Sequence, residues 1–278
     1  MRKLMILLAA AAACLSLRGQ EFQTIPSRWK WISDKEVVFS TSPTYADSAT
    51  FSVTVPSYRI TRGVHAPDKY SQFPIRPQGA VNLTYSPDST KLAFTRGNDL
   101  YVADCASGAE TRLTYDGSDV ILNGYASWVY YEEILGRSSM YKAFWWSPDS
   151  KKIGFYRFDN SKVPMFPIYS PRGQDGTLKQ TRYPKAGETN PQVKIGMIDL
   201  DSPSNIVWAD FDPTEDQYFG IPFWGPDSKD FYIAREPRVQ NTIDLYAVSA
   251  ADGSKKSVYH EEYPTWLNWF EGIIFTDK

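Results

Sequence analysis

The fold is indicated by the stretch Trp146-Ser147-Pro148-Asp149-Ser150, at positions 146–150, which occurs in two further copies. Tyr85-Ser86-Pro87-Asp88-Ser89 precedes it, and Trp224-Gly225-Pro226-Asp227-Ser228 follows it. Proline fixes φ at a turn corner, and Asp or Ser side chains bond to the nearby backbone, so each copy is predicted to form a turn. Each turn leads into a run of strand-forming residues: Lys91–Arg96, Lys151–Phe158 and Lys229–Ala234.

Each repeat is predicted to form a small antiparallel sheet. Gly97-Asn98 separates two strand-like runs, and both residue types tolerate the positive φ of a tight hairpin turn. A sheet of this size cannot bury its faces alone, and the irregular spacing of the copies suits the blades of a β-propeller. A degenerate copy at Trp31-Ile32-Ser33-Asp34 raises the expected number of blades to about four. The alternative is a β-sandwich with chance similarity between its turns.

Composition supports an all-β fold and excludes one class of partner. Aromatic residues make up 15% of the 278 residues, a content that favours strands. The 30 basic and 32 acidic side chains give a net charge of -2, which provides no long-range attraction to a nucleic-acid backbone. No nucleic acid is therefore expected as a partner.

The first residues have the pattern of an export signal. Met1-Arg2-Lys3 is cationic, and Leu4–Ala13 is an apolar run too short to span a bilayer. We expect a signal peptide over 1–19 and a single propeller region over 20–278, in a periplasmic or cell-envelope location. An alternative is a bacterial lipoprotein signal ending at Cys14. Removal of the signal would leave Cys105 alone, which excludes an intrachain disulfide.

The best helix-period segment, Trp128–Tyr141, contains two adjacent carboxylates. Glu132 and Glu133 lie in an aromatic setting, and we expect them on a short helix inserted between blades. From the residues alone, a solvated charged pair at the exposed end of that helix is the simpler interpretation.

Several ordered motifs resemble one family. Trp128-Val129-Tyr130-Tyr131-Glu132-Glu133-Ile134 is followed by Ala143–Asp149, and the further matches are Phe158-Asp159-Asn160, Arg182–Gly187 with Asn190-Pro191, and Arg238 with Gln240-Asn241. Over roughly 80–253 the chain resembles the N-terminal propeller of dipeptidyl peptidase IV enzymes, which are prolyl oligopeptidase-like serine peptidases. The resemblance implies part of an eight-bladed propeller that caps an α/β-hydrolase domain absent from this chain.

The resemblance also implies a function. Glu132 and Glu133 would hold the free ammonium group of a peptide, so that the enzyme removes N-terminal dipeptides of the Xaa-Pro type, while the propeller gates access. The partners implied are peptide N-termini, the missing hydrolase domain and, in the full-length protein, a second copy. The family's carbonyl-binding arginine is not assigned, since Arg96 lies at a tight turn and the insertion that carries this arginine is missing.

No catalytic machinery is expected in this chain. A hydrolase nucleophile elbow has the form Gly-x-Ser-x-Gly, and the nearest approach, Gly136-Arg137-Ser138-Ser139-Met140, lacks the second glycine. His65 and His260 have no paired nucleophile, and the sequence holds no Cys-x-x-Cys or His-Glu-x-x-His, so no metal or cofactor is expected. The chain alone should be inactive. The alternative function is a stand-alone propeller-like binding or scaffold module of the cell envelope without peptidase activity.

Overall fold

The computed structural model describes residues 28–33, 35–40, 50–54, 57, 59–62, 75, 77–137, 140–169, 176, 178–270 and 273–276. The expected signal peptide, Cys14 and His65 lie outside these residues. The chain divides into two compact units, Met1–Pro74 and Ile75–Lys278.

The first unit contains one antiparallel sheet, here called the first sheet. Its strands are β1 (Arg28–Ser33), β2 (Glu36–Ser40), β3 (Thr50–Thr54) and β4 (Arg59–Arg62), which pair in the order of the chain. Val37 in β2 pairs with Val53 in β3, and both side chains are buried. The degenerate repeat copy therefore leads into a sheet of the same kind as the others.

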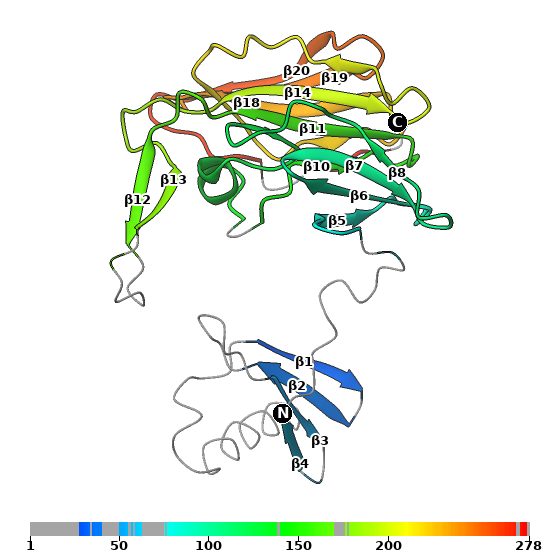
Figure 1. Cartoon of the computed structure of the whole chain (residues 1–278). Helices are drawn as coiled ribbons and strands as arrows, with labels where there is room; N and C mark the ends of the chain where they lie inside the picture. Colours follow the sequence, from blue (N-terminus) through cyan, green and yellow to red (C-terminus); the bar gives the residue numbers. More distant parts are fainter. Residues whose placement is uncertain are drawn as a thin grey trace. The chain divides into compact units, whose positions relative to one another are not determined.

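The second unit contains three larger sheets and a hairpin (Figure 1). The second sheet consists of β5 (Val81–Tyr85), β6 (Lys91–Arg96), β7 (Asp99–Asp104) and β8 (Glu110–Arg112). The third consists of β9 (Ile121–Asn123), β10 (Phe144–Trp146), β11 (Lys152–Asp159), β14 (Gln192–Asp199) and β15 (Ile206–Trp208). The fourth consists of β16 (Gln217–Phe219), β17 (Phe223–Trp224), β18 (Asp230–Pro237), β19 (Thr242–Ser249) and β20 (Lys255–Glu262).

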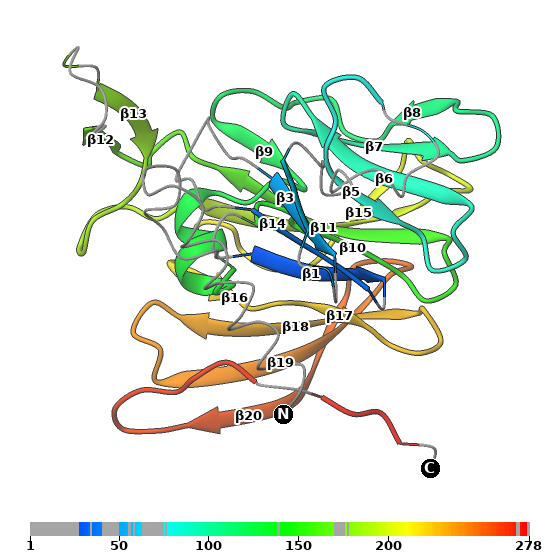
Figure 2. The same ribbon diagram turned by 90° about the horizontal axis from the view of Figure 1, so that it is seen from below.

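The hairpin of β12 (Met165–Tyr169) and β13 (Leu178–Arg182) extends away from the third sheet in both Figure 1 and Figure 2. All strand pairs are antiparallel, and the four sheets confirm the predicted all-β fold of about four propeller-type blades. No helix in the described parts of the chain is long and apolar enough to cross a bilayer.

The repeated turns form through local hydrogen bonds. In the third sheet, Ser147 Oγ donates to Asp149 Oδ1 at 2.5 Å and accepts from the Lys152 N–H at 2.8 Å. Ser86 makes the same two bonds in the second sheet, at 2.6 and 3.0 Å. The last serine of each turn has a left-handed backbone, with φ of 61° at Ser89, 62° at Ser150 and 58° at Ser228. The predicted turns are therefore present in all three copies.

These turns also join successive sheets. The Asp88 N–H donates to Ser150 Oγ at 3.0 Å, and the Asp149 N–H donates to Ser228 Oγ at 3.1 Å. The repeat tryptophans add a parallel link, because Trp146 Nε1 donates to the Thr84 carbonyl and Trp224 Nε1 to the Trp145 carbonyl. One hydroxyl and one indole thus connect the second sheet to the third, and another such pair connects the third sheet to the fourth.

The first strand of the third sheet is interrupted, and the helix with Glu132 and Glu133 lies in this interruption. β9 and β10 pair with opposite ends of β11, so the residues between them form a long insertion within one strand position. The helix carrying Glu132 and Glu133 lies in that insertion, which corrects the expectation that it lies between blades. In the fourth sheet, β16 and β17 pair with β18 around a shorter break at Gly220-Ile221-Pro222.

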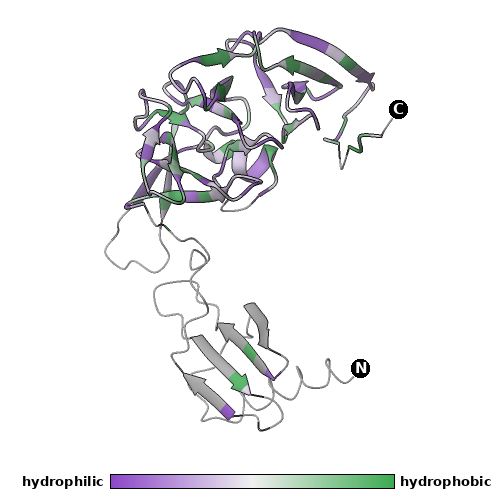
Figure 3. Ribbon diagram, turned by 90° about the vertical axis from the view of Figure 1, so that its right-hand side faces the viewer, coloured by the Kyte–Doolittle hydropathy of each residue, from purple (hydrophilic) through white to green (hydrophobic). Residues whose placement is uncertain are grey.

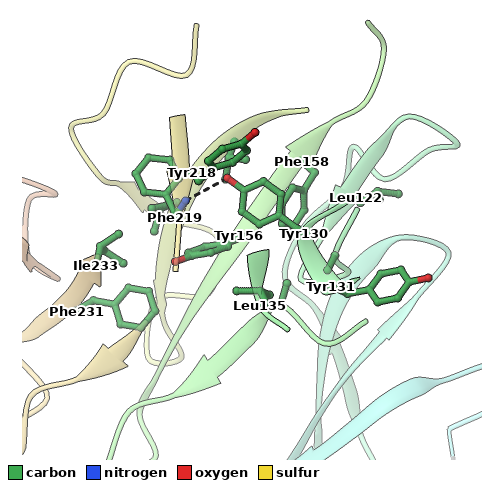
Figure 4. Close-up of a cluster of buried hydrophobic side chains, with 14 of the residues drawn as sticks. Leu122, Tyr130, Tyr131, Leu135, Tyr156, Phe158, Tyr218, Phe219, Phe231 and Ile233 are labelled. Atoms are coloured by element: carbon green, nitrogen blue, oxygen red, sulfur yellow. Dashed lines mark hydrogen bonds between the residues drawn. The ribbon is translucent and has the colours of Figure 1, made fainter. Parts of the chain in front are cut away.

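Apolar side chains fill the space between the sheets. Figure 3 shows hydrophobic and hydrophilic residues alternating along strands of the second unit. The largest cluster joins the insertion to the third and fourth sheets, with Tyr130, Tyr156 and Phe219 fully buried (Figure 4). This core fixes the insertion against the neighbouring sheet.

Candidate functional site

The insertion contains a short helix of π type, η1 (Tyr130–Ile134), preceded by helical Trp128 and Val129. The Leu135 N–H donates to the Tyr130 carbonyl at 2.7 Å, five residues back, which is the hydrogen bond of a π-helix. The helix is shorter than the predicted segment Trp128–Tyr141 because the chain turns at Gly136, where φ is +56°. Short π segments occur frequently at functional sites.

The two faces of this helix differ in burial. Tyr130 and Tyr131 are buried, whereas Glu132 and Glu133 are exposed. The tyrosines anchor the backbone, so the neighbouring carboxylates are held on the solvent side of a fixed element. The predicted glutamate pair is therefore on one short, anchored helix, as expected from the sequence.

Aromatic contacts hold Tyr131 in place. Its ring lies 4.1 Å from that of Tyr141, and the Tyr141 hydroxyl donates to the Tyr131 hydroxyl at 3.1 Å. Tyr141 also stacks on Tyr125, with 4.8 Å between ring centroids. Burial, with smaller effects from Tyr141 and Glu132, raises the pKa of Tyr131 well above its usual value, so this anchor stays neutral.

Glu133 has one hydrogen-bond partner among the described residues. The Tyr183 hydroxyl, which follows β13, donates to Glu133 Oε1 at 3.1 Å. Tyr183 also packs edge-on against Trp128 at the start of the helix. Burial and then the Glu133 carboxylate raise the pKa of Tyr183, which keeps the phenol protonated as a donor.

No ion pair within the described part of the chain includes Glu132 or Glu133. Two carboxylates at adjacent positions without a cation repel one another, and a bound cation would relieve that repulsion. Arg96, in β6 of the second sheet, forms an ion pair with Glu110 at 2.6 Å and lies over the Tyr101 ring. It is therefore engaged within its own sheet.

A cavity of about 580 Å³ lies beside Glu133. One wall is the end of the helix, Glu133–Gly136, and another is the strand break and its continuation, Gly220–Trp224. The remaining lining is mostly aromatic and aliphatic: Ala234, Trp269, Phe270, Ile273 and Phe275. A carboxylate thus borders a largely apolar space.

Sequence reasoning missed this cavity and the role of Tyr183. The interruption Gly220-Ile221-Pro222 before the third repeat copy is the one local signal, because it occupies the same place as the glutamate insertion before the second copy. Tyr183 gives no such signal, since it is 50 residues from Glu133.

The other candidate residues do not form a second site. His260 is exposed on β20, and its Nδ1 lies 2.6 Å from Asp244 Oδ1, a contact that raises the pKa of the imidazole. Within the residues that the structure covers, no group of three or more His, Cys, Asp or Glu side chains could hold a metal ion. Cys105 is a partly exposed free thiol.

Comparison with known proteins identifies the family of this chain. Residues 32–277 match the family described as "Dipeptidyl peptidase IV (DPP IV) N-terminal region". A probable dipeptidyl-aminopeptidase B of Talaromyces marneffei is 37% identical over 142 residues, which cover 46% of this chain and 16% of the relative. Another from Arthroderma benhamiae is 33% identical over 192 residues, covering 64% of this chain and 21% of the relative.

The fold is shared with a solved structure. The crystal structure of Porphyromonas gingivalis dipeptidyl peptidase 4 superimposes with a TM-score of 0.60 at 21% identity, covering 90% of this chain and 34% of that chain. The chain thus spans only a minor part of the length of these three proteins.

Proposed function

Because the chain belongs to the family of dipeptidyl peptidase IV N-terminal regions, we propose that Glu132 and Glu133 bind the N-terminal ammonium group of peptides. The observation that carries this proposal is an exposed carboxylate pair, without a cation among the described residues, beside an apolar cavity. An ammonium group has three donors, and two carboxylates offer enough acceptors for all of them even while Tyr183 occupies one oxygen.

Electrostatics favours a cation at this place. At about 4 Å and an effective dielectric constant of about 20, each carboxylate attracts an ammonium by roughly 4 kcal/mol before the cost of desolvation. Two such contacts direct the ammonium to the helix, and the side chain of the peptide's first residue then has the adjacent apolar space to enter. The site therefore favours a peptide with a free amine and an apolar first side chain.

In a longer protein that contains an α/β-hydrolase domain, the same contacts would set which bond is cut. Anchoring the amine fixes the distance to a nucleophile, so the enzyme would remove dipeptides, of the Xaa-Pro type, from peptide N-termini. The β-sheets would gate access to that domain. We further propose that such a protein is exported to the periplasm or cell envelope and forms a homodimer.

The test is calorimetric titration of the purified chain with Leu-Pro amide and with its N-acetyl derivative. The free amine should bind and the acetylated form should not, and Glu132→Gln with Glu133→Gln should weaken binding of the free amine strongly. Because both carboxylates hold one cation, the double variant should lose less than the sum of the two single variants.

A matched control exists in the same chain. Glu261 and Glu262 are also adjacent and exposed, and Tyr259 donates to Glu261 Oε2 at 2.8 Å much as Tyr183 does to Glu133. Replacing both by glutamine should leave binding unchanged. Equal losses in the two double variants would reduce the effect to general surface charge and favour the alternative of an envelope binding module unrelated to peptide amines.

A further inference from the structure

Two buried tyrosine hydroxyls hold the backbone at the strand break that forms one wall of the cavity. The Phe219 N–H donates to the Tyr130 hydroxyl at 3.2 Å (Figure 4), and the Tyr156 hydroxyl donates to the Gly220 carbonyl at 2.7 Å. Phe219 ends β16, and Gly220 begins the break that lines the cavity. Both hydroxyls therefore hold successive residues at the point where the first strand of the fourth sheet is interrupted.

The tyrosines come from two elements outside the fourth sheet. Tyr130 begins the π-helix two residues before Glu132, and Tyr156 lies in β11 of the third sheet. Their rings meet edge to face with 6.5 Å between centroids, and neither side chain is exposed. Each phenol hydroxyl is thus hydrogen-bonded to the backbone of the fourth sheet from within a packed core. An unpaired hydroxyl in that core would be destabilising.

The backbone at Gly220 is closely packed. A Cβ atom on Gly220 would lie 2.7 Å from Trp269 Cε3, so Gly220 is in close contact with another part of the cavity lining. Its N–H donates to the Ala234 carbonyl at 3.0 Å. The strand break is therefore held by β18 and by Trp269, while Tyr130 ties it to the glutamate helix and Tyr156 ties it to the third sheet, on which that helix is inserted.

We infer that Tyr130 and Tyr156 are positioning residues that set the distance between the glutamate helix and the Gly220–Trp224 wall, and so determine which first side chains of a peptide fit beside its bound ammonium. This inference rests on the proposed function, because it concerns the side chain of the same ligand. Burial raises the pKa of both phenols above their usual value, so both hydrogen bonds persist at neutral pH.

The experiment measures selectivity. Dissociation constants of Gly-Pro amide and Leu-Pro amide are determined for the wild type and for Tyr130→Phe, Tyr156→Phe and the double variant. Removing a hydroxyl loosens the wall that packs on the larger side chain, so the preference for Leu-Pro amide should fall by about fivefold, the equivalent of one neutral hydrogen bond. Binding of Gly-Pro amide should change little.

Tyr218→Phe is the matched control. Tyr218 belongs to the same buried cluster, but its hydroxyl accepts from Asn190 Nδ2 at 2.9 Å, away from the cavity lining. Its loss can lower stability without changing the ratio of the two dissociation constants.

The outcomes separate the two proposals. If the tyrosine variants melt earlier yet keep the wild-type ratio, the tyrosines are merely structural and this inference is wrong, while ammonium binding stands. If the wild type binds neither peptide amide, or if Glu132→Gln with Glu133→Gln leaves binding intact, the proposed function fails and this inference fails with it.

Discussion

At the scale of single residues, the site combines exposed acids with buried phenols. Glu132 and Glu133 are exposed, whereas their helix neighbours Tyr130 and Tyr131 are buried, and Tyr130 packs edge-on against the buried Tyr156. The phenols supply hydrogen bonds without charge, so they anchor the helix without cancelling the negative charge of the glutamates.

Tyr183→Phe should weaken binding of a free-amine dipeptide. The lost hydroxyl donates to Glu133 Oε1, and without it the carboxylate is less well oriented toward the ammonium. Because the contact is at the protein surface, we expect a loss of about 1 kcal/mol or less, or up to about fivefold in affinity. Calorimetric titration checks this, and Tyr259→Phe, which removes the comparable bond to Glu261, is the control.

The buried tyrosines predict a loss of stability at alkaline pH. Burial raises the folded-state pKa of Tyr130 and Tyr156, whereas in the unfolded chain both phenols ionise near pH 10. The folded state therefore binds more protons above that pH, so the free energy of unfolding is unaffected below about pH 10 and falls as the pH rises further. Urea unfolding at pH 8, 10 and 11 should show this fall. The fall should be smaller in Tyr156→Phe. An equal fall of the free energy of unfolding in that variant would contradict the raised pKa of Tyr156.

At the scale of elements, one turn motif has two functions. Within a sheet, its first serine and its aspartate close the turn, and the pKa of Asp88 is lowered to about 2 by its hydrogen bonds from Ser86 and the Thr90 N–H. Between sheets, the last serine accepts a backbone N–H from the preceding turn. The repeat is therefore both the corner of a blade and the connector between blades.

Ser150→Ala and Ser228→Ala should each destabilise the protein. Both hydroxyls are buried and accept the N–H of an aspartate in the preceding sheet, so each loss should cost about 1 kcal/mol. Ser89 is the matched control, because it has the same turn position and positive φ but is exposed. Equal destabilisation by Ser89→Ala in urea unfolding would show that the effect lies within the turn and not between the sheets.

Gly154→Ala should disrupt the packing of the third sheet on the fourth. A Cβ atom at Gly154 would lie 2.5 Å from Phe231 Cζ, and such overpacking costs roughly 1–3 kcal/mol. Gly225→Ala should cost less, since its nearest neighbour would be 3.3 Å away. Adding Phe231→Leu to Gly154→Ala should recover part of the loss in a double-mutant cycle of urea unfolding.

At the scale of the whole molecule, the fourth sheet and the residues after it present much apolar surface. Ile221, Trp266 and Ile274 are 51%, 65% and 88% exposed. β20 is exposed along its whole length, and among the described strands it pairs only with β19. Apolar patches and open strand edges of this kind promote association.

The purified chain should therefore self-associate. Sedimentation velocity should show an average mass that rises with protein concentration, and Trp266→Ser with Ile274→Ser should shift the distribution toward the monomer. The substituted side chains are the two most exposed of the three, so folding should be retained. A monomer at all concentrations with a sharp cooperative melt would contradict this expectation.

The sequence by itself determined the repeated turns, the strand-forming runs that follow them and the segment that carries Glu132 and Glu133. These features depend on neighbours within a few residues, as in the Ser147-to-Asp149 bond, so local chemistry was sufficient to predict them. From composition and periodicity alone, Glu132 and Glu133 were interpreted as a solvated charged pair. The family resemblance added the prediction that they bind a peptide ammonium group.

Only the tertiary structure decided what surrounds those glutamates. The placement of the helix within a strand depends on β9 and β10 sharing β11, which is a pairing between distant segments. Tyr183 reaches Glu133 across 50 residues, Tyr156 reaches Gly220 across 64, and Tyr130 reaches Phe219 across 89. Hydrogen bonds over such separations form only when packing of the apolar sheet faces brings the segments together, so a local pattern could mark the Gly220-Ile221-Pro222 break but could not predict the cavity that it lines.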